Sequence, residues 1–173
     1  MTMVMSGGKR GYSYKSKLGR GFTLIELLLT VTVVALLAVT VLVSLNPAER
    51  IVDAKNARRT TDVDTILAAI HTSIVDSSGA YPSGLTEGMS ETQIGAGTTG
   101  CAIATGGCTV TPTGCVDLAT SLASYMGSMP IDPSGASTYT ADKTGYSVEV
   151  DANGIVTVRA CGSEGGETIS ISR

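Results

Sequence analysis

One long apolar run near the N-terminus dominates the pattern of hydrophobic and polar positions. Residues 22–45, FTLIELLLTVTVVALLAVTVLVSL, contain a single charged side chain, that of Glu26. A helix of this length, rising about 1.5 Å per residue, can cross the hydrocarbon core of a bilayer with some tilt. The run is also longer than the apolar region of a secretory signal peptide. The pattern therefore predicts one transmembrane helix over residues 22–45.

The charges that precede the run predict its orientation. Residues 1–21 contain five basic side chains and no acidic one. The positive-inside rule keeps such a segment in the cytoplasm. We therefore expect a single-pass protein of the cytoplasmic (inner) membrane, in contact with membrane lipid through residues 22–45 and with its C-terminal part exported.

The residues that directly follow the run carry a helix-start pattern. Asn46 fits an N-cap, Pro47 the first helical position, and Glu49 the third position of a variant capping box. These features predict that the membrane helix stops at Leu45 and that a new helix begins. The alternative is that Pro47 kinks one continuous helix.

A helical period then continues from residue 48 to residue 76. Apolar residues recur every three or four positions opposite a polar face, and Ser77-Ser78-Gly79 ends the pattern. The segment is therefore predicted to be an amphipathic helix that packs on an apolar surface. Its apolar positions are Ile51, Val52, Val63, Leu67, Ile70 and Ile74, and its polar positions are Asp53, Arg58, Arg59, Asp62 and Asp64.

The C-terminal part of the chain changes to a period of two. Residues 146–150 and 156–160 alternate apolar and polar side chains around a turn at 151–154, which predicts a hairpin, and residues 168–172 offer a third strand. The amphipathic helix is available to cover the apolar face of this sheet. The predicted fold class is thus α+β, with a long N-terminal helix, half membrane and half amphipathic, packed on a small antiparallel β-sheet.

The segment between the helix and the sheet is less regular. Residues 83–113 are rich in Gly, Thr and Ser and predict a long loop. A short helix is predicted from Val116 to Met126, because Leu118 and Leu122 fall on one side and the prolines of the following MPIDP segment end it.

Four cysteines fall in or after this loop, at Cys101, Cys108, Cys115 and Cys161. In an exported, oxidising setting they predict two disulfides, for which three connectivities are possible. The favoured pattern has one bridge inside the loop and one from the loop to the sheet near Cys161. A zinc site is the competing explanation, but the spacing lacks a Cys-x-x-Cys pair.

Residues 20–26 read RGFTLIE, a basic residue and a glycine followed by an apolar start with a carboxylate at its fifth position. This sequence resembles the class III leaders of the type IV pilins and type II secretion pseudopilins. The resemblance implies cleavage between Gly21 and Phe22 by a prepilin peptidase, N-methylation of Phe22, and pairing of Glu26 with the mature amino terminus of a neighbouring subunit. The later segments ARRTTDVDTILAAI, GAYP, MPIDP and TGYSVEV are similar to pseudopilin segments as well.

Electrostatics supports this role for Glu26 independently. A carboxylate in the hydrocarbon core is costly, so an intramembrane acid is by default a functional residue with a partner. Cleavage would create an ammonium at Phe22 that can neutralise Glu26 between adjacent helices, and buried pairs of this kind set register more than stability. The alternative is a plain single-span anchor in which Glu26 reaches the nearby interface.

We therefore expect a pilin-like structural subunit that polymerises through its N-terminal helix into a type IV pilus or a type II secretion-type pseudopilus. The filament would lie at the cell surface or span the periplasm. The resemblance implies that the partners are like subunits, a prepilin peptidase, and an inner-membrane assembly platform with a cytoplasmic ATPase. The expected organisation is a cleaved leader at 1–21, a transmembrane and polymerisation helix at 22–45, an amphipathic second half at 46–78 and an exported head at 79–173.

Composition bears on the other function classes. Without residues 1–21 the chain has seven basic and fifteen acidic residues, a net charge of about −8. Nucleic acid is therefore not expected as a partner, since phosphate binding needs Lys and Arg, and Arg58-Arg59 is the one local exception. This weighs against the alternative of a competence-type pilin involved in DNA uptake. No enzyme is expected, because the chain has one His and lacks the Gly-x-Ser-x-Gly and His-Glu-x-x-His motifs.

No cofactor is required by the sequence, although calcium is a candidate. Some major pseudopilins bind calcium in the loops of the sheet, and the acids available there are Asp132, Asp142 and Asp151. They do not form an Asp-x-Asp pattern with a turn glycine, which calcium loops often contain. The three aspartates are thus candidate ligands on the resemblance alone.

Overall fold

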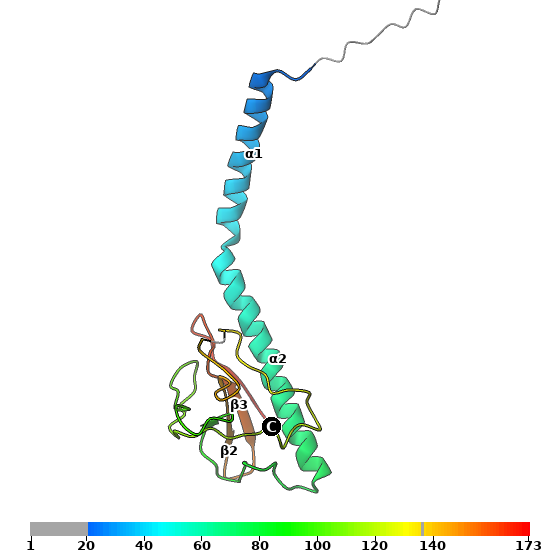
Figure 1. Ribbon diagram of the computed structural model, residues 1–173, viewed down its shortest axis with the longest axis vertical. Coiled ribbons are helices and arrows are strands. Elements are labelled where there is room, and N and C mark those ends of the chain that lie inside the picture. Colours follow the sequence, from blue (N-terminus) through cyan, green and yellow to red (C-terminus); the bar gives the residue numbers. More distant parts are fainter. Residues whose placement is uncertain (1–20, 136) are drawn as a thin grey trace, which may run out of the picture. The chain divides into compact units, whose positions relative to one another are not determined.

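A computed structural model of the chain describes residues 21–135 and 137–173 (Figure 1). The predicted leader lies outside the described residues except for Gly21. The chain divides into two compact units with the boundary between Leu45 and Asn46, and each unit is considered by itself. From here on, the second unit, Asn46–Arg173, is called the head.

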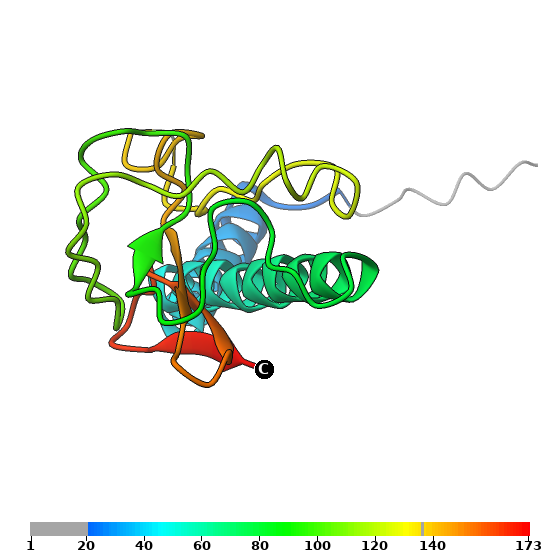
Figure 2. The same cartoon turned by 90° about the horizontal axis from the view of Figure 1, so that it is seen from below.

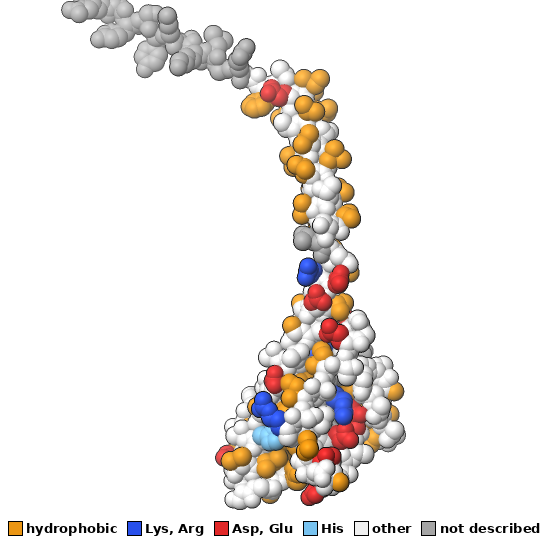
Figure 3. Space-filling view, turned by 180° about the vertical axis from the view of Figure 1, so that it is seen from behind, with side chains coloured by type: hydrophobic (Ala, Val, Ile, Leu, Met, Phe, Trp, Pro, Cys, Tyr) orange, Lys and Arg blue, Asp and Glu red, His pale blue; other side chains and the backbone are white. Residues whose placement is uncertain are grey.

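Helix α1, Leu24–Leu45, is the apolar helix of the first unit. Its span Leu24–Ser44 has a mean hydropathy of 2.7 and none of it is buried within the chain, so it is long and apolar enough to cross a membrane. The hydroxyls of Thr30, Thr32 and Thr40 each donate to the carbonyl three residues earlier, at 2.8 Å. These polar groups are therefore satisfied inside the helix, as a lipid environment requires. Figure 3 shows apolar side chains along this helix.

The second helix, α2, spans Pro47–Asp76. The apolar helix therefore stops at Leu45 and a new helix begins, as predicted, rather than one continuous helix with a kink at Pro47. Asn46 is the N-cap residue and Pro47 begins the helix, as predicted, but the expected side-chain capping bond is not formed. Asn46 lies in the left-handed region (φ 39°, ψ 73°), and its side chain makes no capping bond to a backbone N–H. Its amide instead donates to the Glu49 carboxylate at 3.0 Å. Asparagine is among the few residues that adopt this conformation readily.

At its other end α2 closes with a Schellman motif. The N–H of Gly79 donates to the Ile74 carbonyl at 2.8 Å and that of Ser78 to the Val75 carbonyl at 3.2 Å. Ser78 occupies the left-handed position of this motif with φ 56°.

Replacing Ser78 by glycine is therefore expected to stabilise the head slightly. Glycine removes a side chain from a left-handed position that costs roughly 1–2 kcal/mol for other residues, and part of this gain is lost to the greater freedom of glycine in the unfolded chain. The expected net gain is about 0.5 kcal/mol, measured by urea unfolding of the purified chain. Ser77→Gly is the matched control, because φ is −89° at Ser77, and it should not stabilise.

The sheet has four antiparallel strands in the order β1-β2-β3-β4. The predicted hairpin is confirmed, with Val148 opposite Val158, and so is the third predicted strand, which begins one residue later than expected. The two-residue strand β1 was not predicted. The strands are β1 Thr92–Gln93, β2 Tyr146–Val150, β3 Val156–Ala160 and β4 Ile169–Ser172.

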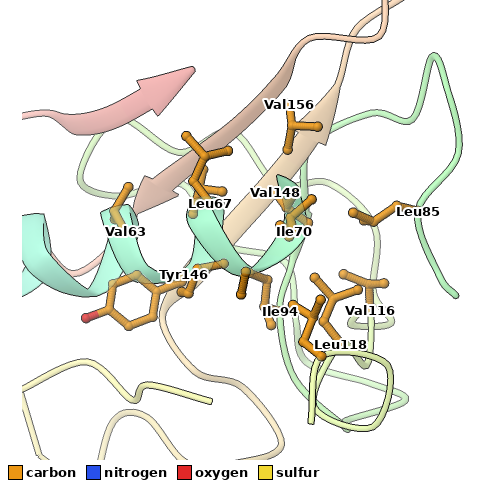
Figure 4. Close-up of a cluster of buried hydrophobic side chains, with 14 of the residues drawn as sticks. Val63, Leu67, Ile70, Leu85, Ile94, Val116, Leu118, Tyr146, Val148 and Val156 are labelled. Atoms are coloured by element: carbon orange, nitrogen blue, oxygen red, sulfur yellow. The ribbon is translucent and has the colours of Figure 1, made fainter. Parts of the chain in front are cut away.

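Helix α2 packs along β3 and β4 (Figure 2), which confirms the predicted α+β class. The core between helix and sheet is aliphatic apart from Tyr146 (Figure 4). Ile51, which was predicted to face the core, is 58% exposed, whereas Ile66 was not predicted and is fully buried. The fully buried core residues of the helix and of the central strands are Val63, Ile66, Ile70, Tyr146, Val148, Val150, Val156, Val158 and Ala160.

The helix predicted over 116–126 is wrong, because this segment forms successive turns. Its backbone hydrogen bonds do not keep one helical spacing. The N–H of Leu122 donates four residues back to the Leu118 carbonyl, whereas that of Tyr125 donates three residues back to the Leu122 carbonyl, each at 2.9 Å. The segment is rich in Ser and Thr, whose side chains compete for backbone groups, and the Ser121 hydroxyl donates to the Leu118 carbonyl at 3.3 Å. Leu118 and Leu122 still reach the core, where both are fully buried.

Candidate functional site

The candidate processing and assembly site lies at the start of α1. Thr23 is the residue before the helix, and its hydroxyl accepts the backbone N–H of Glu26 at 3.2 Å. The Thr23 carbonyl accepts the N–H of Leu27 at 3.1 Å, which closes the first helical turn. Thr23 therefore caps α1 and fixes where the helix begins.

This cap places Glu26 at the third position of the helix. A carboxylate in the first turn is favoured by the positive end of the helix dipole. In the described part of the chain, the Glu26 side chain is exposed and has no ion-pair partner. The carboxylate is thus held in the first turn by the backbone while its charge stays available to a group from another molecule.

The bond that would be cut lies just outside the helix. Gly21 and Phe22 precede the cap, and both are exposed. Around Gly21 no described atom lies within 4 Å of the position that a Cβ would occupy. The Gly21–Phe22 bond therefore lies outside any helix or strand, and the apolar helix begins two residues after Phe22.

One family model matches this region of the chain, at residues 17–42, and its description is a prokaryotic N-terminal methylation motif. The chain carries a prepilin-type methylation motif. A match to this motif agrees with the resemblance of the RGFTLIE segment to the leaders of type IV pilins and pseudopilins. No curated protein and no solved structure gives a significant match to the chain. The motif covers the end of the predicted leader and most of α1, so the rest of the chain has to be interpreted from its own residues.

Thr23 is a residue of the motif that sequence reasoning missed. The signal was present, since Thr23 and Glu26 have the Thr-x-x-Glu spacing of a capping box. Only the half of the box in which Thr23 accepts the Glu26 N–H is formed.

The head contains a buried ion pair that was also missed. The guanidinium of Arg59 donates twice to Asp132, from Nε to Oδ2 at 2.8 Å and from Nη2 to Oδ1 at 2.9 Å, and both side chains are fully buried. Asn56 and Ser134 satisfy further donors of Arg59, each at 2.8 Å. The sequence prediction that Arg59 lies on the exposed polar face of the helix is therefore wrong. It lies four residues before Val63, on the core side.

The charges around this pair tie three segments together. Lys55 donates to Glu164 at 3.0 Å, and the Glu164 carboxylate lies 3.6 Å from Arg59. Asn56 donates to the Glu164 carbonyl and to the Glu167 carboxylate, each at 3.0 Å. The first half of α2 is thus joined to the 132–134 loop and to the loop before β4.

The three candidate calcium ligands are not brought together. Asp132 is engaged by Arg59, and the Oδ1 atom of Asp151 accepts the N–H groups of Asn153 and Ile155, each at 2.8 Å, inside the hairpin turn. The bond from Ile155 is the chief cause that holds the pKa of Asp151 below its ordinary value. Asp142 is exposed. Within the described residues, these aspartates do not form a cluster of metal-ligand geometry.

The cysteines form two disulfides. Cys101 pairs with Cys115 inside the loop, and Cys108 pairs with Cys161 at the end of β3. This pairing has the form favoured from the sequence. The second bridge holds the loop against the face of the sheet opposite α2, where Cys108 Sγ lies 3.3 Å from the Ser147 hydroxyl. The loop therefore covers a sheet face that the alternating pattern alone would leave to solvent.

Proposed function

We propose that the chain is a filament subunit that is cut between Gly21 and Phe22 by a prepilin peptidase, methylated at Phe22, and polymerised through α1. The observation that carries the proposal is the single carboxylate of α1, Glu26, inside the matched motif and four residues after Phe22. Helix α1 is apolar on all sides, and none of it is buried against the described part of its own chain. Lipid covers such a helix before assembly, and the helices of like subunits cover it afterwards.

The pairing of Glu26 with a neighbouring amino terminus follows from charge. After cleavage, the ammonium of Phe22 and the carboxylate of Glu26 are the charged groups of an otherwise apolar rod. If they meet between adjacent helices, both are neutralised, and only one register allows this at every subunit. The Thr23 cap supports the arrangement, because it keeps Phe22 outside the helix and Glu26 in its first turn.

The head favours a protein filament over a nucleic-acid receptor. Of its few cations, Arg59 is fully buried, while Lys55 and Arg159 make ion pairs with Glu164 and Glu149 at 3.0 and 2.7 Å. The Arg58-Arg59 pair is consequently not an exposed basic patch. A competence-type filament that binds DNA directly would need such a patch, and a gel shift at low salt tests for it.

The experiment that tests the proposal is the intact mass and the N-terminal residue of the protein from its native membrane or from sheared filaments. A mature chain that begins at methylated Phe22 is the expected result. A chain that still begins at Met1 would contradict the proposal and favour the plain single-span anchor. Recovery from sheared cell-surface filaments would favour a pilus, whereas retention with the envelope would favour a type II secretion-type pseudopilus.

Replacing Gly21 by leucine is expected to block processing. The exposed, side-chain-free position before the scissile bond becomes bulky, so the peptidase should leave the leader attached. The measurement is the initial rate of cleavage, followed by mass spectrometry and expected to fall at least about tenfold, which corresponds to about 1.4 kcal/mol in the transition state. Glu26→Ala serves as the comparison, since it should be cleaved normally. Normal cleavage of Gly21→Leu would show that the chain is not cut between Gly21 and Phe22.

A further inference from the structure

The two disulfides of the head lie in different electrostatic surroundings. A carboxylate oxygen of Glu91 lies within 4.8 Å of the sulfurs of both Cys108 and Cys161, and all three residues are buried. Sulfurs joined to each other do not ligate a metal, so the cluster is not a metal site in this form. The Cys101–Cys115 bridge is not part of a comparable cluster within the described residues.

Glu91 is fixed in this position by several donors. Its Oε2 accepts the backbone N–H and the hydroxyl of Thr109, at 2.8 and 2.9 Å, and its Oε1 accepts the Ser147 hydroxyl at 2.6 Å. Arg159 lies 3.7 Å from Glu91 but makes its short bond, 2.7 Å, to Glu149. The charge of Arg159 is thus shared between two carboxylates, and the group formed by Glu91, Glu149 and Arg159 keeps a net negative charge beside the sulfurs.

We propose that Glu91 protects the Cys108–Cys161 disulfide from reduction by negative charge, so that the head has one resistant bridge and one labile bridge. A thiolate reductant attacks one sulfur and forms a mixed disulfide, and the S–S electron pair leaves on the other cysteine as a thiolate. Both the incoming and the departing thiolate would lie beside the buried Glu91 carboxylate. In a medium of low effective dielectric constant, like charges at this distance repel strongly.

Cys101–Cys115 lacks this protection and is half-buried at Cys115. The Cys101–Cys115 disulfide is therefore reduced and re-formed by thiols in the surroundings, while the Cys108–Cys161 disulfide, which joins the loop to the sheet, stays oxidised. Under reducing conditions the loop thus stays attached to the sheet and continues to cover it. Only the disulfide within the loop is broken.

The test is timed reduction of the full chain in detergent with dithiothreitol, which becomes the cyclic disulfide as each protein bridge gains two protons and two electrons. Alkylation and peptide mass spectrometry give the rate for each bridge. Glu91→Gln is expected to speed the opening of Cys108–Cys161 at least about tenfold, while Cys101–Cys115 changes less than about twofold. Glu87→Gln is the matched control, because Glu87 is an exposed acid that makes no ion pair among the described residues, and it should leave both rates unchanged.

Two further measurements keep the proposal falsifiable if Glu91→Gln folds poorly. In the wild-type chain, the ratio of the reduction rate with cationic cysteamine to that with anionic thioglycolate should be larger at Cys108–Cys161 than at Cys101–Cys115. In strong denaturant, the wild type and the Glu91→Gln variant should open both bridges at equal rates. Equal cysteamine-to-thioglycolate ratios at the two bridges, or equal acceleration of both bridges in folded Glu91→Gln, would overturn the proposal.

Discussion

Replacing Glu26 by alanine is expected to abolish filaments while leaving the chain processed, inserted in the membrane and folded. The substitution removes only the carboxylate, since the cap at the start of α1 uses the backbone N–H of Glu26 and the hydroxyl of Thr23. Helix α1 should therefore begin at the same residue. The ammonium of Phe22 would be left without a partner among apolar helices, and breaking a buried pair in this way costs about 3–5 kcal/mol.

That free energy is lost again at every subunit added, so the expected loss of filaments is complete. The measurement combines electron microscopy and immunoblotting of sheared filaments with the intact mass of the membrane form. Glu26→Gln should fail as well, because it keeps the shape and removes the charge. Glu49→Ala is the matched control, an exposed acid in the first turn of α2 and outside the matched motif, and it should assemble normally. Normal filaments from Glu26→Ala would refute the pairing.

The elements set by periodicity could be predicted from the sequence. The alternation of β2 and β3 and the helical spacing of α2 place most of the core, because burial of one face requires those periods. Strand β1 could not be predicted, since two residues carry no period. The predicted helix over 116–126 failed because its Ser and Thr side chains compete with a weak apolar pattern.

The candidate site divides in the same way. Gly21, Phe22 and Glu26 could be placed as candidates because their signal is contiguous in sequence. The position of Arg59, four residues before Val63, was compatible with the core face, but its charge favoured the polar face when only the helix was considered. Its partner Asp132 lies 73 residues away in sequence. Only the packing of the 132–134 loop on α2 shows that a buried guanidinium has an acceptor there.

The largest effect on folding is expected at this buried pair. Asp132→Asn and Arg59→Ala should each destabilise the head by about 3–5 kcal/mol, because each leaves the other charge buried without its doubly hydrogen-bonded partner. Urea unfolding of the purified chain measures this loss. Arg58→Ala is the matched control on the neighbouring residue, which is 63% exposed and 3.7 Å from Asp62, and it should change stability by less than about 0.5 kcal/mol.

The double variant Arg59→Met with Asp132→Leu separates charge from packing. Two apolar side chains of similar volume leave no unpaired charge, so much of the lost stability should return. If the double variant is as unstable as the single ones, the hydrogen bonds to Asn56 and Ser134, rather than the ion pair, hold the loop on α2. A near-neutral single substitution at Asp132 would refute the role of the pair altogether.

The same pair predicts how the head responds to acid. Burial alone would raise the pKa of Asp132, but the hydrogen bonds from Arg59 and Ser134 outweigh it, so the pKa lies below its ordinary value. A carboxylate with a lowered folded-state pKa contributes stability that is complete above its unfolded pKa, about 3.9, and is lost as the pH falls through the folded value. Stability should therefore decline below about pH 4. The Arg59→Met, Asp132→Leu variant should show a shallower decline. Acid destabilises the wild type because the unfolded chain takes up a proton at Asp132 more readily than the folded chain does, and the variant has no carboxylate at this position.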